Sequence, residues 1–321
     1  MKKFTKCTAF LLLCAWLLPA NVFAKELIPV GEVVGLELRD DTVTIAAFDE
    51  QLGAAAKAAG VSVGDQIIRI DGTAVRSSAD VRNALKNANG QVELSVVRNG
   101  KEKTYSLTPE VTESGPKLGV YLRQGITGIG TVTYYDPDTG SFGTLGHGVN
   151  DSDGKLLQMT QGYAYDAKVL TVRKGRAGDP GQLMSSVDGD SPIGVLSANT
   201  DRGVFGTTET GWQGKTVTVA ESDEVKTGPA VIRSTVSGDT VREYSVEILK
   251  IYPKSRQNGR NLLLRVTDPA LLSATGGIVQ GMSGSPILQN GKLIGAVTHV
   301  LVNDPTTGYG IFIENMLDAA A

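Results

Sequence analysis

The chain has 321 residues, of which 41% are hydrophobic and 20% charged, and its formal net charge is -3. This composition can build packed cores, so it excludes a disordered chain, and it offers no basic surface for nucleic acid. Glycine is abundant, with 39 residues, whereas aromatic residues make up only 6%. That balance favours many short strands joined by tight turns.

The first 24 residues have the features of a secretory signal. Lys2, Lys3 and Lys6 precede an apolar run that ends in small residues. We predict a signal peptide or an uncleaved membrane anchor over residues 1–24, and therefore an exported protein with membrane association through its N-terminus as one alternative.

The cysteines restrict the chemistry of the rest of the chain. Both of them, Cys7 and Cys14, fall inside the apolar leader. Residues 25–321 therefore lack the thiols that disulfides, zinc–thiolate sites and cysteine nucleophiles require. We expect no metal and no cofactor.

Residues 25–110 are expected to form a separate α+β domain. Residues 41–47 and 91–97 have strand patterns, residues 79–89 have helical spacing, and Asn99-Gly100 indicates a hairpin turn. Between them, AAGVSVGDQIIRIDGTAV at residues 58–75 resembles the signature of bacterial PDZ domains.

The PDZ resemblance implies a groove that binds the C-terminal end of a peptide, from another protein or from a second copy of the chain. Such domains add the peptide to a sheet edge and hold its carboxylate with backbone N–H groups. By that resemblance the binding loop is expected at Gly35, Leu36, Glu37 and Leu38; the alternative is that Gly35 only opens a strand and the groove is unused.

Residues 111–117 are polar and contain a proline, so they are predicted to be a linker, with a second domain over 118–321. This region consists of short apolar runs between glycine-rich turns, as in an all-β sandwich or a pair of barrels.

The stretch GMSGSPI at residues 281–287 contains the strongest catalytic candidate. Its G-x-S-G-x-P pattern is that around the serine of chymotrypsin-like peptidases, although the same residues also form ordinary turns. Ser283 would be the nucleophile, and the N–H groups of Gly281 and Ser283 the oxyanion hole. Ser285 is a weaker candidate because it precedes a proline.

A serine nucleophile needs a base, and the chain has only two histidines. His147 lies between two glycines after an apolar strand, where a substrate could reach it, so we predict that it is the base. His299 follows a buried-strand pattern and is predicted to be a pocket wall. Spacing does not choose the acid, because the following aspartates all lie between His147 and Ser283: Asp166, Asp179, Asp188, Asp190, Asp201 and Asp268.

Residues 266–314, which include VTDPALLSATGGIVQGMSGSPI, closely resemble the stage IV sporulation protein B peptidases of endospore-forming bacteria. The order of an exported N-terminus, a PDZ domain, a Gly-His-Gly segment and the serine motif agrees with that family. The resemblance implies a chymotrypsin-like double β-barrel with Ser283, His147 and Asp268 as its triad. The alternative for Asp268 is a structural residue that caps the segment at Pro269.

The resemblance also implies a role in sporulation signalling. Such enzymes cross the inner forespore membrane into the space between the forespore and mother-cell membranes, and they cleave themselves and a membrane-protein regulator of an intramembrane protease. This cleavage allows the late mother-cell sigma factor to be activated. Two alternatives stay open from sequence: a PDZ-containing binding protein with an inactive barrel, and a general envelope quality-control protease.

Overall fold

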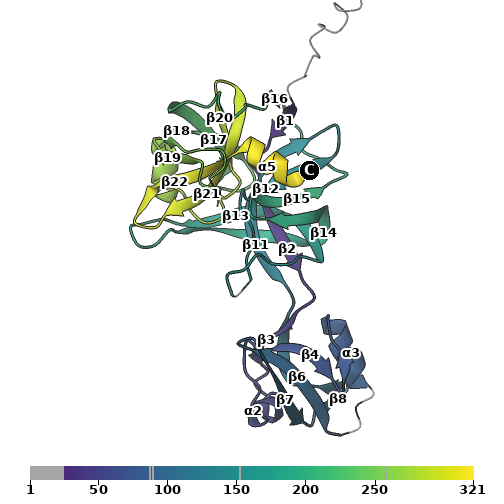
Figure 1. Ribbon diagram of the computed structural model, residues 1–321. Helices are drawn as coiled ribbons and strands as arrows, with labels where there is room; N and C mark the ends of the chain where they lie inside the picture. Colours follow the sequence, from purple (N-terminus) through teal and green to yellow (C-terminus); the bar gives the residue numbers. More distant parts are fainter. Residues whose placement is uncertain (1–24, 87, 89, 152, 257–258) are drawn as a thin grey trace, which may run out of the picture.

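The computed structural model describes residues 25–321 except 87, 89, 152 and 257–258. The predicted leader over residues 1–24 lies outside the described residues. Among the helices that are described, none is both long and apolar enough to span a membrane. Strands dominate, and they form two barrels and a smaller separate sheet (Figure 1).

The first barrel is built on an eight-stranded antiparallel sheet. The strand order is β12-β15-β14-β13-β2-β11-β1-β16, and an additional pairing of β12 with β11 closes six of the strands into a ring. Its strands are β1 (Glu26–Pro29), β2 (Val33–Arg39), β11 (Ile126–Asp136), β12 (Ser141–Thr144), β13 (Gln161–Arg173), β14 (Gln182–Thr200), β15 (Gly203–Thr207) and β16 (Val217–Thr218).

The second barrel is closed in the order β17-β18-β19-β22-β21-β20. Its strands and two helices are β17 (Gly228–Thr235), β18 (Val241–Ile251), β19 (Leu262–Val266), α4 (Pro269–Thr275), β20 (Pro286–Gln289), β21 (Lys292–Leu301), β22 (Asp304–Phe312) and α5 (Ile313–Ala320). The expected double β-barrel is therefore confirmed.

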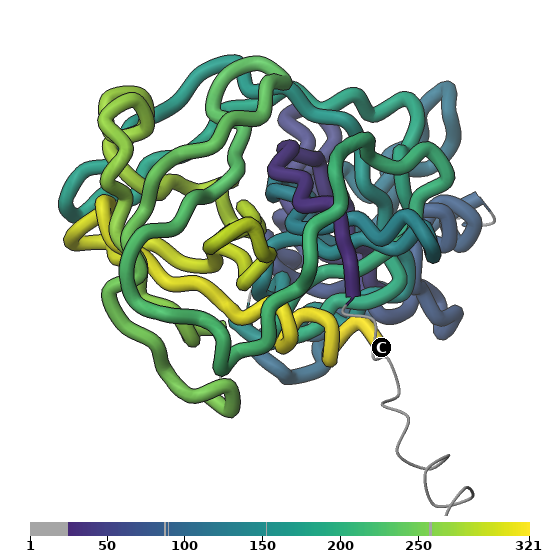
Figure 2. Tube along the Cα trace, turned by 90° about the horizontal axis from the view of Figure 1, so that it is seen from above, coloured from purple at the N-terminus to yellow at the C-terminus, as the bar shows by residue number. Residues whose placement is uncertain are grey.

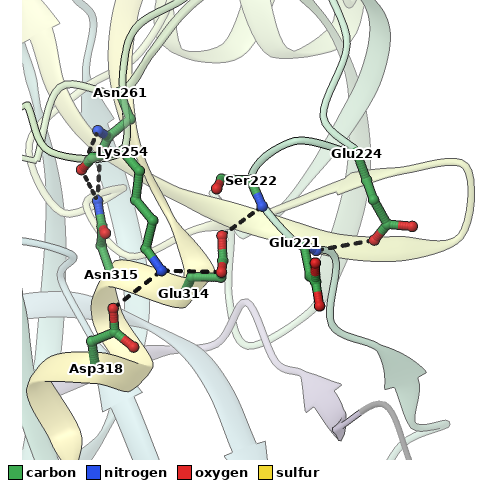
Figure 3. A network of polar contacts seen from close by, with 8 residues as sticks. All are labelled: Glu221, Ser222, Glu224, Lys254, Asn261, Glu314, Asn315 and Asp318. Carbon is green, nitrogen blue, oxygen red and sulfur yellow. Dashed lines mark hydrogen bonds and ion pairs between the residues drawn. The ribbon is translucent and has the colours of Figure 1, made fainter. Parts of the chain in front are cut away.

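Helix α5 is bonded to the second barrel and contributes Ile313 and Met316 to the apolar contact between the two barrels. In the view from above, the C-terminal segment, drawn in yellow, leaves the second barrel and ends beside the first (Figure 2). Lys254 Nζ pairs with Glu314 and Asp318 of α5 at 3.1 and 3.3 Å, and Asn315 donates to Asn261 Oδ1 at 3.0 Å (Figure 3). A buried cluster between the barrels combines Leu27, Tyr134, Phe205, Leu293, Ala296, Ile311, Ile313 and Met316.

The smaller sheet belongs to the PDZ unit, which forms the lower lobe in Figure 1. Its strand order is β10-β3-β4-β6-β7, with β5 paired to β4, and it has its own hydrophobic core. The elements are β3 (Val43–Phe48), α2 (Ala54–Ala58), β4 (Gln66–Ile70), β5 (Thr73–Ala74), α3 (Ser78–Lys86), β6 (Val92–Arg98), β7 (Lys101–Leu107) and β10 (Val120–Arg123), with a hairpin of β8 (Glu110–Thr112) and β9 (Gly115–Lys117).

The domain boundaries differ from the expected ones. The sequence predicted a PDZ domain over 25–110 followed by a peptidase domain over 118–321. Strands β1 and β2 pair with β11 of the first barrel, so the PDZ unit is inserted between β2 and β11. The predicted linker over 111–117 is wrong, because these residues form most of the β8–β9 hairpin. A strand pattern shows which residues face a core but not which sheet they join, since that depends on distant partners.

Candidate active site

Ser283 lies in a tight turn just before β20, and the turn is fixed on both sides by hydrogen bonds. From β11, Thr131 N donates to Ser283 O at 2.9 Å, and Thr131 Oγ1 donates to Gly281 O at 2.8 Å. Thr133 Oγ1 donates to Gly284 O at 2.7 Å. From the other side, Gly284 N donates to a carbonyl of β21 at 2.7 Å. The nucleophile turn of the second barrel is thus attached to a strand of the first.

Gly284 makes this attachment sterically feasible. Its φ is +97°, and a Cβ atom at this position would lie 1.9 Å from Thr131 O and 2.6 Å from Leu145 N. Only glycine fits such an approach of backbone to backbone. Because Leu145 is two residues before His147, the close packing also brings the serine turn against the histidine segment.

The His147 segment follows β12, where Leu145 and Gly146 turn the chain with φ of +67° and +68°. His147 Nδ1 shares a hydrogen bond of 3.0 Å with the carbonyl of Gly148. With the proton on Nδ1, Nε2 is a free acceptor, as a general base requires. Burial lowers the pKa of His147, so the ring is neutral near pH 7.

His299 lies on β21, and its ring centroid is 5.2 Å from that of His147 with an angle of 43° between the ring planes. Burial, the neighbouring His147 and Arg260 lower the pKa of His299 to about 4. The ring predicted to be a pocket wall therefore lies directly beside the predicted base.

The serine hydroxyl donates at 2.9 Å to the carbonyl of Thr298, the residue before His299. It must turn away from that carbonyl to give its proton to His147. Within the described residues, the N–H groups of Gly281 and Ser283 donate no hydrogen bond. The motif predicts that these two groups form the oxyanion hole, and in the structure they are not used by a protein acceptor.

Asp268 is not placed where the family resemblance predicts. It is the N-cap of α4, where Oδ1 accepts from the N–H groups of Ala270 and Leu271 at 2.9 and 3.0 Å, while Oδ2 accepts from Ser245 N at 3.3 Å. Pro269 occupies the first helical turn, where the backbone N–H that proline lacks would have no intrahelical acceptor. Asp268 therefore caps the helix at Pro269, which was the alternative to a role in the triad. Within the described residues, no hydrogen bond joins Asp268 to either histidine.

Ser285, the weaker nucleophile candidate, is fully buried and donates to Ser234 Oγ at 3.1 Å. It is inaccessible to a substrate. Sequence reasoning missed Thr131, Thr133 and Thr298, which hold the serine turn and its hydroxyl. A threonine in a strand is common, and nothing in the local sequence distinguishes these three.

The profile of the SpoIVB peptidase S55 family matches residues 114–317, which is more than half of the chain. The chain belongs to this family. It is a serine peptidase, and the PDZ domain profile matches residues 34–108.

Other similarities to the S55 peptidase chain are partial. A Bartonella henselae protein named as a zinc metalloprotease is 33% identical over 131 residues, covering 39% of this chain and 36% of that protein. The Rv3671c protease of Mycobacterium tuberculosis, in its inactive form, has 16% identity and a TM-score of 0.35 over 61% of this chain and 85% of its own. The PDZ domain of the SdrC-like protein of Listeria monocytogenes has 22% identity and a TM-score of 0.22 over 26% and 87%.

A groove of about 670 Å³ lies beside the serine turn of the S55 peptidase. It is lined by residues of β2, β11 and β14, among them Ile129 and Leu183, which pack against Gly281 at 3.0 to 3.1 Å from its Cβ position. Two of the side chains that line this groove therefore also contact the serine turn.

The predicted PDZ loop at Gly35, Leu36, Glu37 and Leu38 is wrong. These residues form part of β2, whose two edges are taken by β11 and β13, so no peptide strand can be added there. Gly35 is a glycine because a Cβ would lie 2.5 Å from Val187.

The groove of the PDZ unit lies instead between β10 and α3. A cavity of about 250 Å³ is lined by Val81, Arg82 and Leu85 of α3 and by residues 116–122. Within the described residues β10 pairs only with β3, so its other edge is free. Gly119 turns the chain into β10 with φ of +68°, and a Cβ there would lie 2.0 Å from Leu52 O. An antiparallel peptide would place its C-terminus near this glycine.

Proposed function

We propose that the chain is an endopeptidase in which Ser283 attacks the substrate carbonyl, His147 takes the serine proton and returns it to the leaving amine, and the N–H groups of Gly281 and Ser283 bind the oxyanion. The observation that carries this proposal is the packing of the Gly284 turn against the segment that precedes His147, across Thr131.

A fluorophosphonate probe tests the proposal on the purified full chain. We expect one adduct, at Ser283, that mass spectrometry localises and that is lost in Ser283→Ala and His147→Ala. An unlabelled but folded wild-type chain would favour the alternative of a binding protein with an inactive barrel.

We propose further that the enzyme acts in sporulation signalling, outside the membrane that it crosses, on itself and on a membrane-protein regulator of an intramembrane protease. The S55 family membership supports this role. In an endospore-forming bacterium that makes the protein, replacing it with Ser283→Ala should abolish late mother-cell sigma activity. Retention of that activity would favour a general quality-control protease.

We propose that the PDZ groove binds peptide C-termini. The open edge of β10 and the glycine turn at its start favour the addition of a peptide strand there. A fluorescent peptide with an apolar C-terminal residue should bind the full chain when its carboxylate is free. The amidated peptide should bind much more weakly, and equal binding of the two would contradict the proposal.

A further inference from the structure

Two arginines lie over one tyrosine close to the predicted base. Tyr309 on β22 is paired with His299 on β21, and residues that face each other across an antiparallel pair point to the same side of the sheet. The ring of His299 lies 5.2 Å from that of His147, between centroids. Tyr309 is therefore the cross-strand neighbour of the imidazole that lies beside His147.

The guanidinium groups of Arg256 and Arg260 lie 5.8 and 5.5 Å from the centroid of the Tyr309 ring. Arg260 is also close enough to His299 to contribute to the lowered pKa of that imidazole. Several other arginines of the chain pair with a carboxylate at 2.6 to 2.9 Å. Within the described residues, Arg256 and Arg260 form no such pair, so two positive charges lie beside the site without a negative partner.

Gly259, just before Arg260, packs against the segment that leads to His147. Its φ is +58°, and a Cβ atom at this position would lie 3.0 Å from the carbonyl oxygen of Gly146. The carbonyl of Gly259 accepts a hydrogen bond of 2.9 Å from the hydroxyl of Thr298. The backbone that carries Arg260 is therefore fixed on the side of the candidate active site.

Asn261, just after Arg260, fixes the backbone on the other side. It is fully buried, its N–H donates to Gly310 O at 2.8 Å, and its side-chain amide donates to Pro253 O at 2.9 Å. The side chain of Arg260 is nevertheless exposed. An exposed cation on a fixed backbone is already positioned for a ligand, which reduces the entropy lost on binding.

We propose that Arg260, together with Arg256, binds an acidic side chain of the substrate, an aspartate or a glutamate close to the scissile bond. This inference rests on the proposed roles of Ser283 and His147 and adds a substrate preference to them. A guanidinium presents two parallel N–H groups that match the two oxygens of a carboxylate. The substrate would supply the negative partner that both arginines lack, and Arg256 would add a second positive charge over the same ring.

Cleavage of a peptide mixture locates the acidic position. The full chain is incubated with tryptic peptides of known sequence, and mass spectrometry maps the new ends. We expect aspartate or glutamate to be enriched at one position within about three residues of the cleaved bond, because contacts through His299 and Tyr309 link Arg260 to His147. The absence of an acidic preference at every position would overturn the inference.

A matched pair of peptides then isolates the charge. Both have the mapped sequence and blocked ends, with glutamate at the acidic position in one and glutamine in the other. We expect kcat/KM of the wild-type chain to be roughly tenfold higher for the glutamate peptide, and the ratio to fall at high salt. Arg260→Gln should bring the ratio close to one, and Arg260→Glu should invert it. Because each ratio compares two substrates of one variant, a general loss of activity cancels.

Arg242→Gln is the control, because Arg242 is an exposed arginine of the same barrel that is not stacked on Tyr309. It should keep the wild-type ratio. An unchanged ratio in Arg260→Gln, or an equal fall in Arg242→Gln, would overturn the inference, and labelling of Ser283 by a fluorophosphonate would then leave the proposed function intact. An unlabelled wild-type chain would overturn both.

Discussion

The nucleophile turn and the PDZ groove use their backbones in opposite ways. At residues 281–285 carbonyl and N–H groups are bonded to β11 and β21, so the serine has little freedom. At β10 one edge of the backbone has no strand partner among the residues that the structure describes, which leaves it open to a peptide. Chemistry needs groups fixed in advance, whereas strand addition needs groups left open.

The largest expected effect is at Gly284. Gly284→Ala would force its methyl group into Thr131 O, so we expect loss of Ser283 labelling and a lower melting temperature, with about 3 kcal/mol or more of lost stability. Gly291→Ala is the control, because Gly291 also has a positive φ of +77° but open space around its Cβ position. It should cost about 1 kcal/mol and label normally. Normal labelling of Gly284→Ala would show that the turn is not fixed as described.

A smaller effect is expected from Thr131→Val, which removes the hydroxyl bond to Gly281 O. Leaving that buried carbonyl unpaired should cost about 1–3 kcal/mol and should slow labelling roughly tenfold, since Gly281 is proposed to supply an oxyanion donor. Thr235→Val removes a comparable buried bond, to Gly31 O at 3.1 Å, which does not involve any of residues 281–285. The control should lose similar stability in thermal unfolding and keep its labelling rate. If both variants slow equally, the effect is one of general stability.

The smallest effect is expected in the groove. Lys117→Glu places a negative charge at the end where the peptide carboxylate would lie, so affinity for the free-carboxylate peptide should fall a few-fold, by about 0.5–1 kcal/mol, and less at high salt. Lys103→Glu, on β7, makes the same charge change outside the residues that line the groove. Fluorescence anisotropy measures both, and labelling of Ser283 should not change in either. Equal weakening by the two substitutions would argue against this end of the groove.

The sequence was sufficient for the features that local residue order determines. The PDZ signature and the serine peptidase family were predicted correctly, and Asn99 and Gly100 have the positive φ values of the predicted hairpin turn. The catalytic roles of Ser283 and His147 stay predictions, although the structure brings their segments together. The PDZ signature, the serine motif and the hairpin turn each depend on a few residues that are neighbours in the sequence.

The errors share one cause, which is pairing between distant segments. Gly35 and Leu36 were assigned to a PDZ loop, yet β2 pairs with β11 and β13, which both come after residue 125. Asp268 lies close to Ser283 in sequence, but the start of α4 takes both of its oxygens. The position of His299 beside His147 was not predicted, because it depends on how two barrels meet.

The insertion of the PDZ unit has a consequence for how the protein can be altered. Leu38 pairs directly with Ile126, so the two ends of the inserted segment emerge side by side from one antiparallel strand pair. A short Asn-Gly turn could join these strands without disturbing their register. The PDZ unit can therefore be deleted from the strand pair that supports the serine turn. We expect the deletion to leave both barrels with all of their strands.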